Sequence, residues 1–156
     1  MLMTAADYRE SLRALKPRVF VGGRQVASVA DEPLLAPGIN AIGVTYDFAH
    51  RPDYAALMTA TQQDSGRLAN SMLHVNGSRD DLLAKLEAVR LVCRESGCAQ
   101  RYLAHDALNA LHQGTRLADD VHGGERHQRF LAYLDDVQAR DLTLGIAMTD
   151  AKGDRS

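Results

Sequence analysis

Residues 78–93 read SRDDLLAKLEAVRLVC, and this stretch says most about the fold. Ser78 followed three residues later by Asp81 is the pattern of a helix capping box. Apolar side chains then recur at helical spacing, as a stripe made of Leu82, Leu86, Val89 and Cys93. The pattern predicts an amphipathic helix that buries this stripe. Gly97 interrupts the pattern and marks the end of the helix.

Similar signals recur on both sides of this helix. Thr4 with Asp7 predicts a second capping box, and Pro17 stops the helix that follows. Helical patterns also cover residues 39–49, a stretch from Cys98 or Ala104 to Leu117, and residues 124–140. The buried side of the last helix is expected to hold His127, Phe130, Leu131, Leu134 and Val137.

Other segments predict strands and loops. Residues 19–26 contain Gly22-Gly23 between Val19-Phe20-Val21 and Gln25-Val26, which predicts a small β-hairpin. Residues 31–38 are expected to form a loop, and a short helical turn is expected near Leu57. Residues 67–74 are interpreted as either extended or loop. The expected class is therefore mainly α with a minor hairpin.

Composition narrows the function classes. The 156 residues suffice for one domain, and 46% are apolar, which is enough for a core. The formal net charge of -2, with mixed signs along the chain, gives no argument for nucleic acid or an anionic membrane. Cys93 and Cys98 are too few for a disulfide framework, and no leader or membrane span is evident. A cytoplasmic location is the default expectation.

Two groups of polar residues are candidate sites. The six histidines form no i, i+4 pair of the kind that binds zinc on a helix. Arg101, His105, Asn109 and His112 share one helical face, which either borders a ligand pocket or is simply solvated. Residues 148–156 (MTDAKGDRS) lack an apolar period and are rich in groups that bind phosphate. They indicate either a solvated linker or the start of a ligand-binding segment.

The whole chain resembles the N-terminal part of the 4-hydroxyphenylacetate 3-hydroxylase / 4-hydroxybutyryl-CoA dehydratase flavoprotein family, with the dehydratase (vinylacetyl-CoA delta-isomerase) branch closer. The most specific segment is 147–155. The other residues that carry the resemblance are Met1–Ala5, Tyr8, Glu10–Arg13, Arg18-Val19, Pro37–Asn40, Thr45-Tyr46, Leu57–Thr59, Gln100-Arg101, Asp106–Ala110 and Tyr133-Leu134.

The resemblance implies a fold similar to acyl-CoA dehydrogenases: a helical domain, a β domain and a C-terminal bundle that forms a homotetramer. Residues 1–141 would be the helical N-terminal domain. Residues 142–156 would begin the β-rich middle domain, and the rest of the enzyme would be the missing partner. The expected cofactor is FAD, and the substrate would be an acyl-CoA or a phenol.

By the same resemblance, the terminal segment lies against the FAD. Its cofactor-binding residues would be Met148, Thr149, Asp150, Lys152, Gly153, Asp154 and Arg155. Thr149 would contact the isoalloxazine edge, while Lys152, Gly153 and Arg155 would lie near phosphates. The dehydratase pattern has proline where this chain has Ala151, which loosens the turn without removing a functional group.

The dehydratases also carry a Cys-x-x-x-Cys pair that supplies two ligands to a four-iron four-sulfur cluster. The first ligand position matches Cys98, but the second is Tyr102, and a phenol is a poor ligand for a soft iron site. Cys93 belongs to the apolar stripe and is expected in the core. The resemblance therefore leaves three readings: a dehydratase or isomerase, a flavin-dependent aromatic monooxygenase, and a non-catalytic helical fragment. The catalytic acid and base would lie beyond Ser156.

Overall fold

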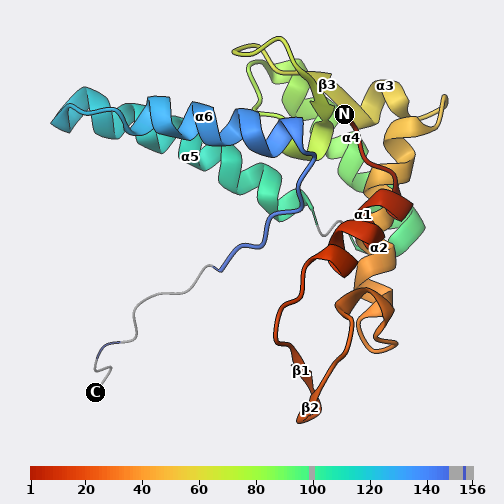
Figure 1. The fold of residues 1–156 in the computed structure, drawn as a ribbon. Coiled ribbons are helices and arrows are strands. Elements are labelled where there is room, and N and C mark those ends of the chain that lie inside the picture. Colours follow the sequence, from red (N-terminus) through yellow and green to blue (C-terminus); the bar gives the residue numbers. More distant parts are fainter. Residues whose placement is uncertain (99–100, 148–152, 154–156) are drawn as a thin grey trace.

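The computed structural model describes residues 1–98, 101–147 and 153, and it is mainly helical (Figure 1). In chain order, the α-helices are α1 (Ala5–Ala14), α2 (Ala36–Asp47), α3 (Ala55–Met58), α4 (Arg79–Ser96), α5 (Tyr102–His122) and α6 (Arg126–Ala139). Three 3-10 turns join them: η1 (Val29–Asp31), η2 (Phe48–His50) and η3 (Ser71–Leu73). Figure 1 shows α5 and α6 as a long antiparallel pair that extends to one side of the other helices.

Two small antiparallel hairpins accompany the helices. β1 (Phe20–Val21) pairs with β2 (Arg24–Gln25) through the turn Gly22-Gly23, as the sequence predicts, and both glycines have positive φ. β3 (Thr59–Thr61) pairs with β4 (Leu68–Asn70), with Thr59 opposite Asn70. The second hairpin was missed because each strand has three residues, too few for an alternating pattern.

Both predicted capping boxes are present. The Thr4 hydroxyl accepts a hydrogen bond from the Asp7 N–H, and the Ser78 hydroxyl accepts one from the Asp81 N–H. In each box the carboxylate accepts a hydrogen bond from the backbone N–H of the capping residue. Helix α4 ends at Ser96 and is capped by Gly97, whose N–H donates to the Cys93 carbonyl and whose positive φ turns the chain out of the helix. Local signals therefore set the ends of α4 and the start of α1.

The predicted loop at residues 31–38 is partly wrong. Helix α2 begins at Ala36, so Pro37 and Gly38 lie inside its first turn. Proline is tolerated there because the first turn of a helix has no internal partner for its N–H groups. The helix then buries Ile39 and Tyr46.

The predicted buried stripe of α4 is also wrong. Leu82, Leu86 and Cys93 are exposed, whereas Ala88 and Val92 are completely buried. Helix α4 packs its small-residue face against α2 and α3. Small side chains allow helices to approach closely. The face of α4 that carries Ala88 and Val92 is therefore the buried one, although the leucines on the other face are larger and more apolar.

Among the described residues, three apolar clusters form the core. One joins α4 to η2 and α3 through Phe48, Met58 and Val92, and a second joins η3 to α5 and α6 through Leu73, Leu108 and Phe130. The third joins α1 to α2 through Tyr8, Ile39 and Tyr46. Phe130, Leu134 and Val137 of the last helix are buried as predicted, while His127 and Leu131 are only half-buried.

Candidate functional site

The junction between α4 and α5 carries the predicted metal ligand. Cys98 is exposed, and its backbone carbonyl accepts a hydrogen bond from the Ser96 hydroxyl at 2.5 Å. Tyr102 opens α5 and packs partly against the cluster formed by Phe48 and Val92. The junction therefore presents one accessible thiol close in sequence to one half-buried phenol.

The surroundings of Tyr102 keep its phenol protonated. A hydrogen bond to the Asp106 carboxylate and its negative charge raise the pKa of Tyr102 above its usual value. Lys85 forms an ion pair with Asp106, and its ammonium lies 5.3 Å from the centre of the Tyr102 ring. A neutral phenol engaged in this way is a weak ligand for iron.

These residues do not fit a four-iron cluster. Within residues 1–98, 101–147 and 153, no group of three His, Cys, Asp or Glu side chains is placed to hold a metal ion. Cys98 is accessible, but the position of the second thiolate is filled by Tyr102. The expectation that Cys93 lies in the core is wrong, since Cys93 is exposed on α4. Cys93 lies on the same exposed face of α4 as Leu82 and Leu86, so its place in the apolar stripe did not bury it.

A buried ion pair lies directly beside this junction. Arg101 donates from Nη2 to Oδ1 of Asp141 at 2.8 Å, and both side chains are completely buried. The Arg101 guanidinium also stacks over the Tyr46 ring, with its carbon 4.1 Å from the ring centre. Asp141 adopts a positive φ of 48°, a conformation that aspartate tolerates better than most residues.

The same network holds the start of the C-terminal segment. The Tyr46 hydroxyl donates to the Asp141 carbonyl at 2.9 Å and lies 2.8 Å from the Thr143 hydroxyl. Arg101 donates a further hydrogen bond to the Leu142 carbonyl. Burial raises the pKa of Tyr46, so its hydroxyl stays protonated and able to donate. Tyr46 of α2 and Arg101 at the start of α5 thus hold residues 141–143 against the helices.

Most of the predicted flavin segment lies outside the described residues. This applies to Met148, Thr149, Asp150, Lys152, Asp154 and Arg155. Gly153 is described, is exposed, and has open space where a Cβ would stand. Leu142 and Leu144, which precede this segment, pack against the cluster of α5 and α6. The flavin contacts therefore remain a prediction.

The shared face of Arg101, His105, Asn109 and His112 is not solvated. Arg101 is 1% and His105 2% exposed, while Asn109 and His112 are half-buried. Burial, followed by the charge of Lys85, lowers the pKa of His105 to about 4, so its ring is neutral at pH 7. Its Nδ1 is 3.0 Å from the Ser71 carbonyl, and its Nε2 is 3.1 Å from Oδ1 of Asn76. The alternative that this face borders a pocket is the correct one for His105, which lines a cavity together with His74.

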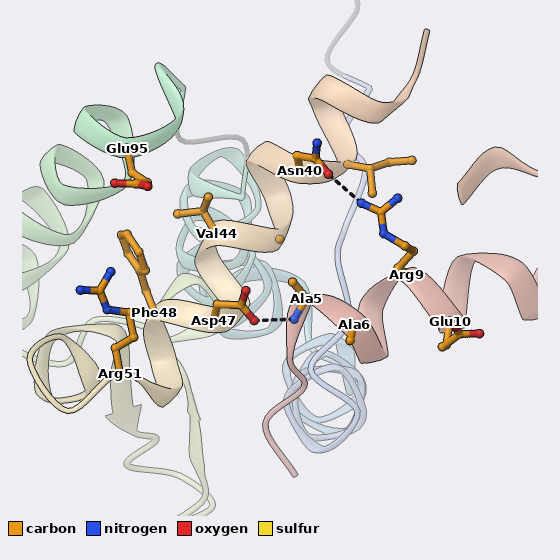
Figure 2. A pocket seen from close by; sticks show the side chains of 12 residues that line it. Ala5, Ala6, Arg9, Glu10, Asn40, Val44, Asp47, Phe48, Arg51 and Glu95 are labelled. Atoms are coloured by element: carbon orange, nitrogen blue, oxygen red, sulfur yellow. Dashed lines mark hydrogen bonds between the residues drawn. The ribbon is translucent and has the colours of Figure 1, made fainter. Parts of the chain in front are cut away.

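A larger hollow of about 430 Å³ lies over α1 and α2, with Glu95 of α4 at its edge (Figure 2). Two hydrogen bonds lie within its wall. Asp47 accepts from the Ala5 N–H at 2.8 Å, and Arg9 donates to the Asn40 amide oxygen at 2.6 Å. These bonds join α1 to α2.

Residues 4–156 match the protein family described as 4-hydroxyphenylacetate 3-hydroxylase N terminal. The chain belongs to this family. The resemblance inferred from the sequence is thereby confirmed.

Two curated relatives of this N-terminal family cover the chain almost completely. The 4-hydroxybutyryl-CoA dehydratase/vinylacetyl-CoA-Delta-isomerase of Clostridium aminobutyricum is 40% identical over 156 residues, which are 99% of this chain and 32% of the relative. The 4-hydroxyphenylacetate 3-monooxygenase oxygenase component of Thermus thermophilus is 24% identical over 159 residues, covering 100% of this chain and 32% of the relative. The chain thus spans about a third of the length of the curated relatives it matches.

Solved structures agree with the family's fold. An oxygen-tolerant archaeal 4-hydroxybutyryl-CoA dehydratase from N. maritimus superposes with a TM-score of 0.92 at 38% identity, covering 99% of this chain and 31% of that one. The oxygenase component of 4-hydroxyphenylacetate 3-monooxygenase, complexed with FAD and 4-hydroxyphenylacetate, gives a TM-score of 0.70 at 21% identity over 90% of this chain and 29% of that one. The second likeness concerns the fold alone. The predicted class, a helical N-terminal domain of the acyl-CoA dehydrogenase type, is confirmed.

Sequence reasoning missed several residues around these sites. Asp141 is part of the buried network, yet it follows a polar helix end and has no periodic neighbour. His74 and Ser71 fall in the stretch interpreted as extended or loop, and both are nearly buried. Residues 67–74 mix polar and apolar side chains without a regular period, so the sequence does not show which of them are buried.

Along the part of the chain that the structure describes, no helix combines the length and the apolar character that crossing a bilayer requires.

Proposed function

We propose that this chain is the N-terminal part of an FAD-dependent enzyme of the 4-hydroxybutyryl-CoA dehydratase/vinylacetyl-CoA delta-isomerase type, acting on a four-carbon acyl-CoA. One observation carries the proposal: the likeness to the dehydratases is consistently stronger than that to the oxygenases. Identity is 40% against 24% among curated relatives, and the TM-score is 0.92 against 0.70 among the cited structures.

Isomerisation is the favoured reaction within this proposal. Dehydration must remove an unactivated β-proton and expel a γ-hydroxyl, which calls for a Lewis acid in the family's dehydratases. Tyr102 stands where the second cluster cysteine is expected, and its phenol is kept neutral by Asp106. Moving the double bond of vinylacetyl-CoA expels no hydroxyl, so this reaction depends less on a Lewis acid at the junction between α4 and α5.

The terminal segment is proposed as this chain's contribution to the flavin site, with residues 142–156 opening the middle domain. Thr149 would hydrogen-bond the isoalloxazine edge, and Lys152 and Arg155 would attract phosphate oxygens. Support comes from the Arg101–Asp141 pair and the Tyr46 hydroxyl, which fix the point where this segment departs. The bound flavin would supply redox chemistry at the substrate's Cα and Cβ.

A second candidate is a flavin-dependent monooxygenase that hydroxylates a phenol, with reduced flavin supplied by a reductase. Tyr102 favours the monooxygenase, because a tyrosine at this position replaces the second cluster cysteine that sets the dehydratases apart. Under either function, the active enzyme would be a cytoplasmic homo-oligomer. A third candidate is a non-catalytic helical module that takes part only in assembly.

Two fusions distinguish these candidates. This chain would replace the matching third of the Clostridium aminobutyricum dehydratase in one, and of the Thermus thermophilus oxygenase in the other. We expect the dehydratase fusion to bind FAD and isomerise vinylacetyl-CoA, with little dehydration of 4-hydroxybutyryl-CoA. Hydroxylation of 4-hydroxyphenylacetate by the oxygenase fusion alone would favour the monooxygenase. Failure of both fusions to bind FAD would favour the non-catalytic module.

Variants of the active fusion test the site residues. Tyr102→Cys should allow reconstitution with iron and sulfide and raise dehydration relative to isomerisation, whereas Tyr102→Phe should not. Thr149→Ala should weaken FAD binding, and Lys152→Ala should mainly weaken binding of acyl-CoA, because a charge acts on phosphate over a longer distance than a hydroxyl does. Unchanged binding in both variants would remove the terminal segment from the site.

A further inference from the structure

Helix α5 carries an apolar stripe on the side that faces away from α6. Its buried side packs mainly against α6 and turn η3, where Leu108 contacts the cluster of Phe130 and Leu73. On the other side, apolar and small residues recur at alternating steps of four and three positions, which is the heptad spacing of helices that pair side by side. We call these residues the outer stripe: Leu103, Ala107, Ala110, Gly114, Leu117 and Val121.

Most of the outer stripe is exposed. Leu103, Leu117 and Val121 are 51%, 62% and 73% exposed, although large apolar side chains are among those most often buried. A Cβ built on Gly114 would meet open space. Figure 1 shows the α5–α6 pair extending to one side of the other helices, where it can reach another molecule. A contiguous exposed apolar face of this kind marks an interaction surface.

The sizes of its side chains suit the outer stripe to another helix. The middle of the stripe consists of Ala107, Ala110 and Gly114, while leucine and valine lie toward its two ends. Small side chains let a second helix approach closely, and the larger ones can then pack on either side of the contact. The stripe itself carries no charged residue. It therefore favours an apolar helix face as its partner.

The order of sizes also makes the outer stripe complementary to itself. In a two-fold arrangement with the two α5 helices antiparallel and residue 112 at the centre, Gly114 lies opposite Ala110 of the second copy. Leu117 likewise lies opposite Ala107 of the second copy, so a large side chain meets a small one. The leucine and valine at the ends face each other. Two-fold pairing of one surface with itself is the commonest arrangement of homodimers.

We propose that the outer stripe of α5 is an interface at which two copies of this chain pair as antiparallel helices. The seam from Leu103 to Val121 is about 27 Å long at about 1.5 Å per residue. A single pair of helices of this length is at the small end of specific interfaces, so the dimer should dissociate on dilution. The proposal is independent of the flavin chemistry, because every residue of the stripe lies in α5.

Sedimentation of the 156-residue chain over a wide range of concentrations tests this interface. We expect a reversible equilibrium between monomer and dimer. In the isotopically labelled chain, the amide chemical shifts of Ala107, Ala110 and Gly114 should change with concentration along the same binding curve.

Gly114→Glu is the sharpest variant. Glutamate is a better helix former than glycine and its side chain enters open space in the monomer, so the melting temperature should not fall. The dimer should weaken at least about tenfold, because like charges that meet in an interface cost several kcal/mol. Gln128→Glu, at an exposed position of α6, adds the same charge and should leave the dimer unchanged.

Cross-linking tests the antiparallel order, in a chain whose exposed Cys93 and Cys98 are replaced by serine. A mixture of the Leu103→Cys and Val121→Cys variants should form a mixed disulfide on oxidation with diamide, because these positions face each other across the seam. Neither variant should cross-link efficiently with itself, since its two thiols lie at opposite ends of the seam. Efficient self-cross-linking of Val121→Cys would indicate a parallel pair and overturn the proposed arrangement.

Two other outcomes would assign the outer stripe differently. A chain that stays monomeric at every concentration would overturn the proposal. If Gly114→Glu then lowered the stability of the dehydratase fusion, the rest of the enzyme would be what covers the stripe. A dimer that Gly114→Glu leaves intact would place the interface elsewhere on the chain, and the assignment to α5 would be wrong.

Discussion

Arg101 and Asp141 form an ion pair that is completely buried and joins the start of α5 to the end of α6. Oδ1 of Asp141 faces the Arg101 guanidinium, and Oδ2 accepts a hydrogen bond from the Met3 N–H at 3.0 Å. One carboxylate therefore connects the N-terminal segment, α5 and the departure of the C-terminal segment. Removing one partner of such a pair leaves an uncompensated buried charge.

Asp141→Asn should lower the free energy of unfolding by about 3 kcal/mol, the cost of breaking a buried ion pair. Asparagine has the same shape and tolerates the positive φ, so the change isolates the charge. Urea unfolding measures the effect. Asp136→Asn is the matched control, because its pair with Arg140 is exposed and should contribute less than about 0.5 kcal/mol. Equal effects of the two substitutions would contradict a special role for Asp141.

His105 should make stability depend on pH. Its pKa is about 4 in the fold against an ordinary 6.5, so the folded chain favours the neutral ring. The unfolded chain binds the proton first as pH falls. Stability is therefore full above pH 6.5 and decreases between pH 6.5 and 4, by roughly 3 kcal/mol from a shift of this size.

Urea unfolding of the wild-type chain and of His105→Gln, each at pH 7 and pH 4.5, measures this loss. In His105→Gln, most of the difference in unfolding free energy between pH 7 and pH 4.5 should disappear. His112 contributes the part that remains, with the same sign, because burial also lowers its pKa. His50→Gln should keep the full pH dependence. The same dependence in all three proteins would assign it to other groups.

Substitutions on the two faces of α4 should differ in how much stability they cost. Val92→Ala removes completely buried methyl groups and should cost about 1–2 kcal/mol, whereas Cys93→Ser on the exposed face should change stability by less than about 0.5 kcal/mol. Cys93 and Cys98 should both react rapidly with a thiol reagent in the folded chain. Slow reaction of Cys93, or a large loss of stability in Cys93→Ser, would mean that the stripe predicted from the sequence is the buried face of α4.

The contrast on α4 shows which parts of this fold are readable from sequence. The starts of α1 and α4 are local events in which Thr4 or Ser78 bonds within its own turn, so the sequence predicts them correctly. Which face of α4 is buried depends on α2 and α3, which approach the small side chains Ala88 and Val92. Leucines on the opposite face give a strong periodic signal and are nevertheless exposed.

The candidate sites divide in the same way. Cys98 and Tyr102 were recognisable because they fall at the two positions of a family motif, four residues apart in the sequence. The cavity beside His74 depends on α3, β3, the η3 region, α4 and α5 meeting in space, and the short strand β3 that helps to build it leaves no periodic signal. Asp141 likewise acquires its role only when α6 returns alongside α5 to bring it to Arg101.

Tyr46→Phe should loosen the departure of the C-terminal segment while leaving the helical core intact. The substitution keeps the ring that stacks on Tyr8 and under Arg101, and removes only the hydroxyl that contacts the Asp141 carbonyl and Thr143. Losing these bonds should cost about 1–2 kcal/mol. Hydrogen exchange should accelerate at residues 142–144 more than in α4. Tyr133→Phe, on an exposed tyrosine, should have neither effect. If exchange rose equally throughout the chain, Tyr46 would be stabilising the whole domain rather than fixing the start of this segment.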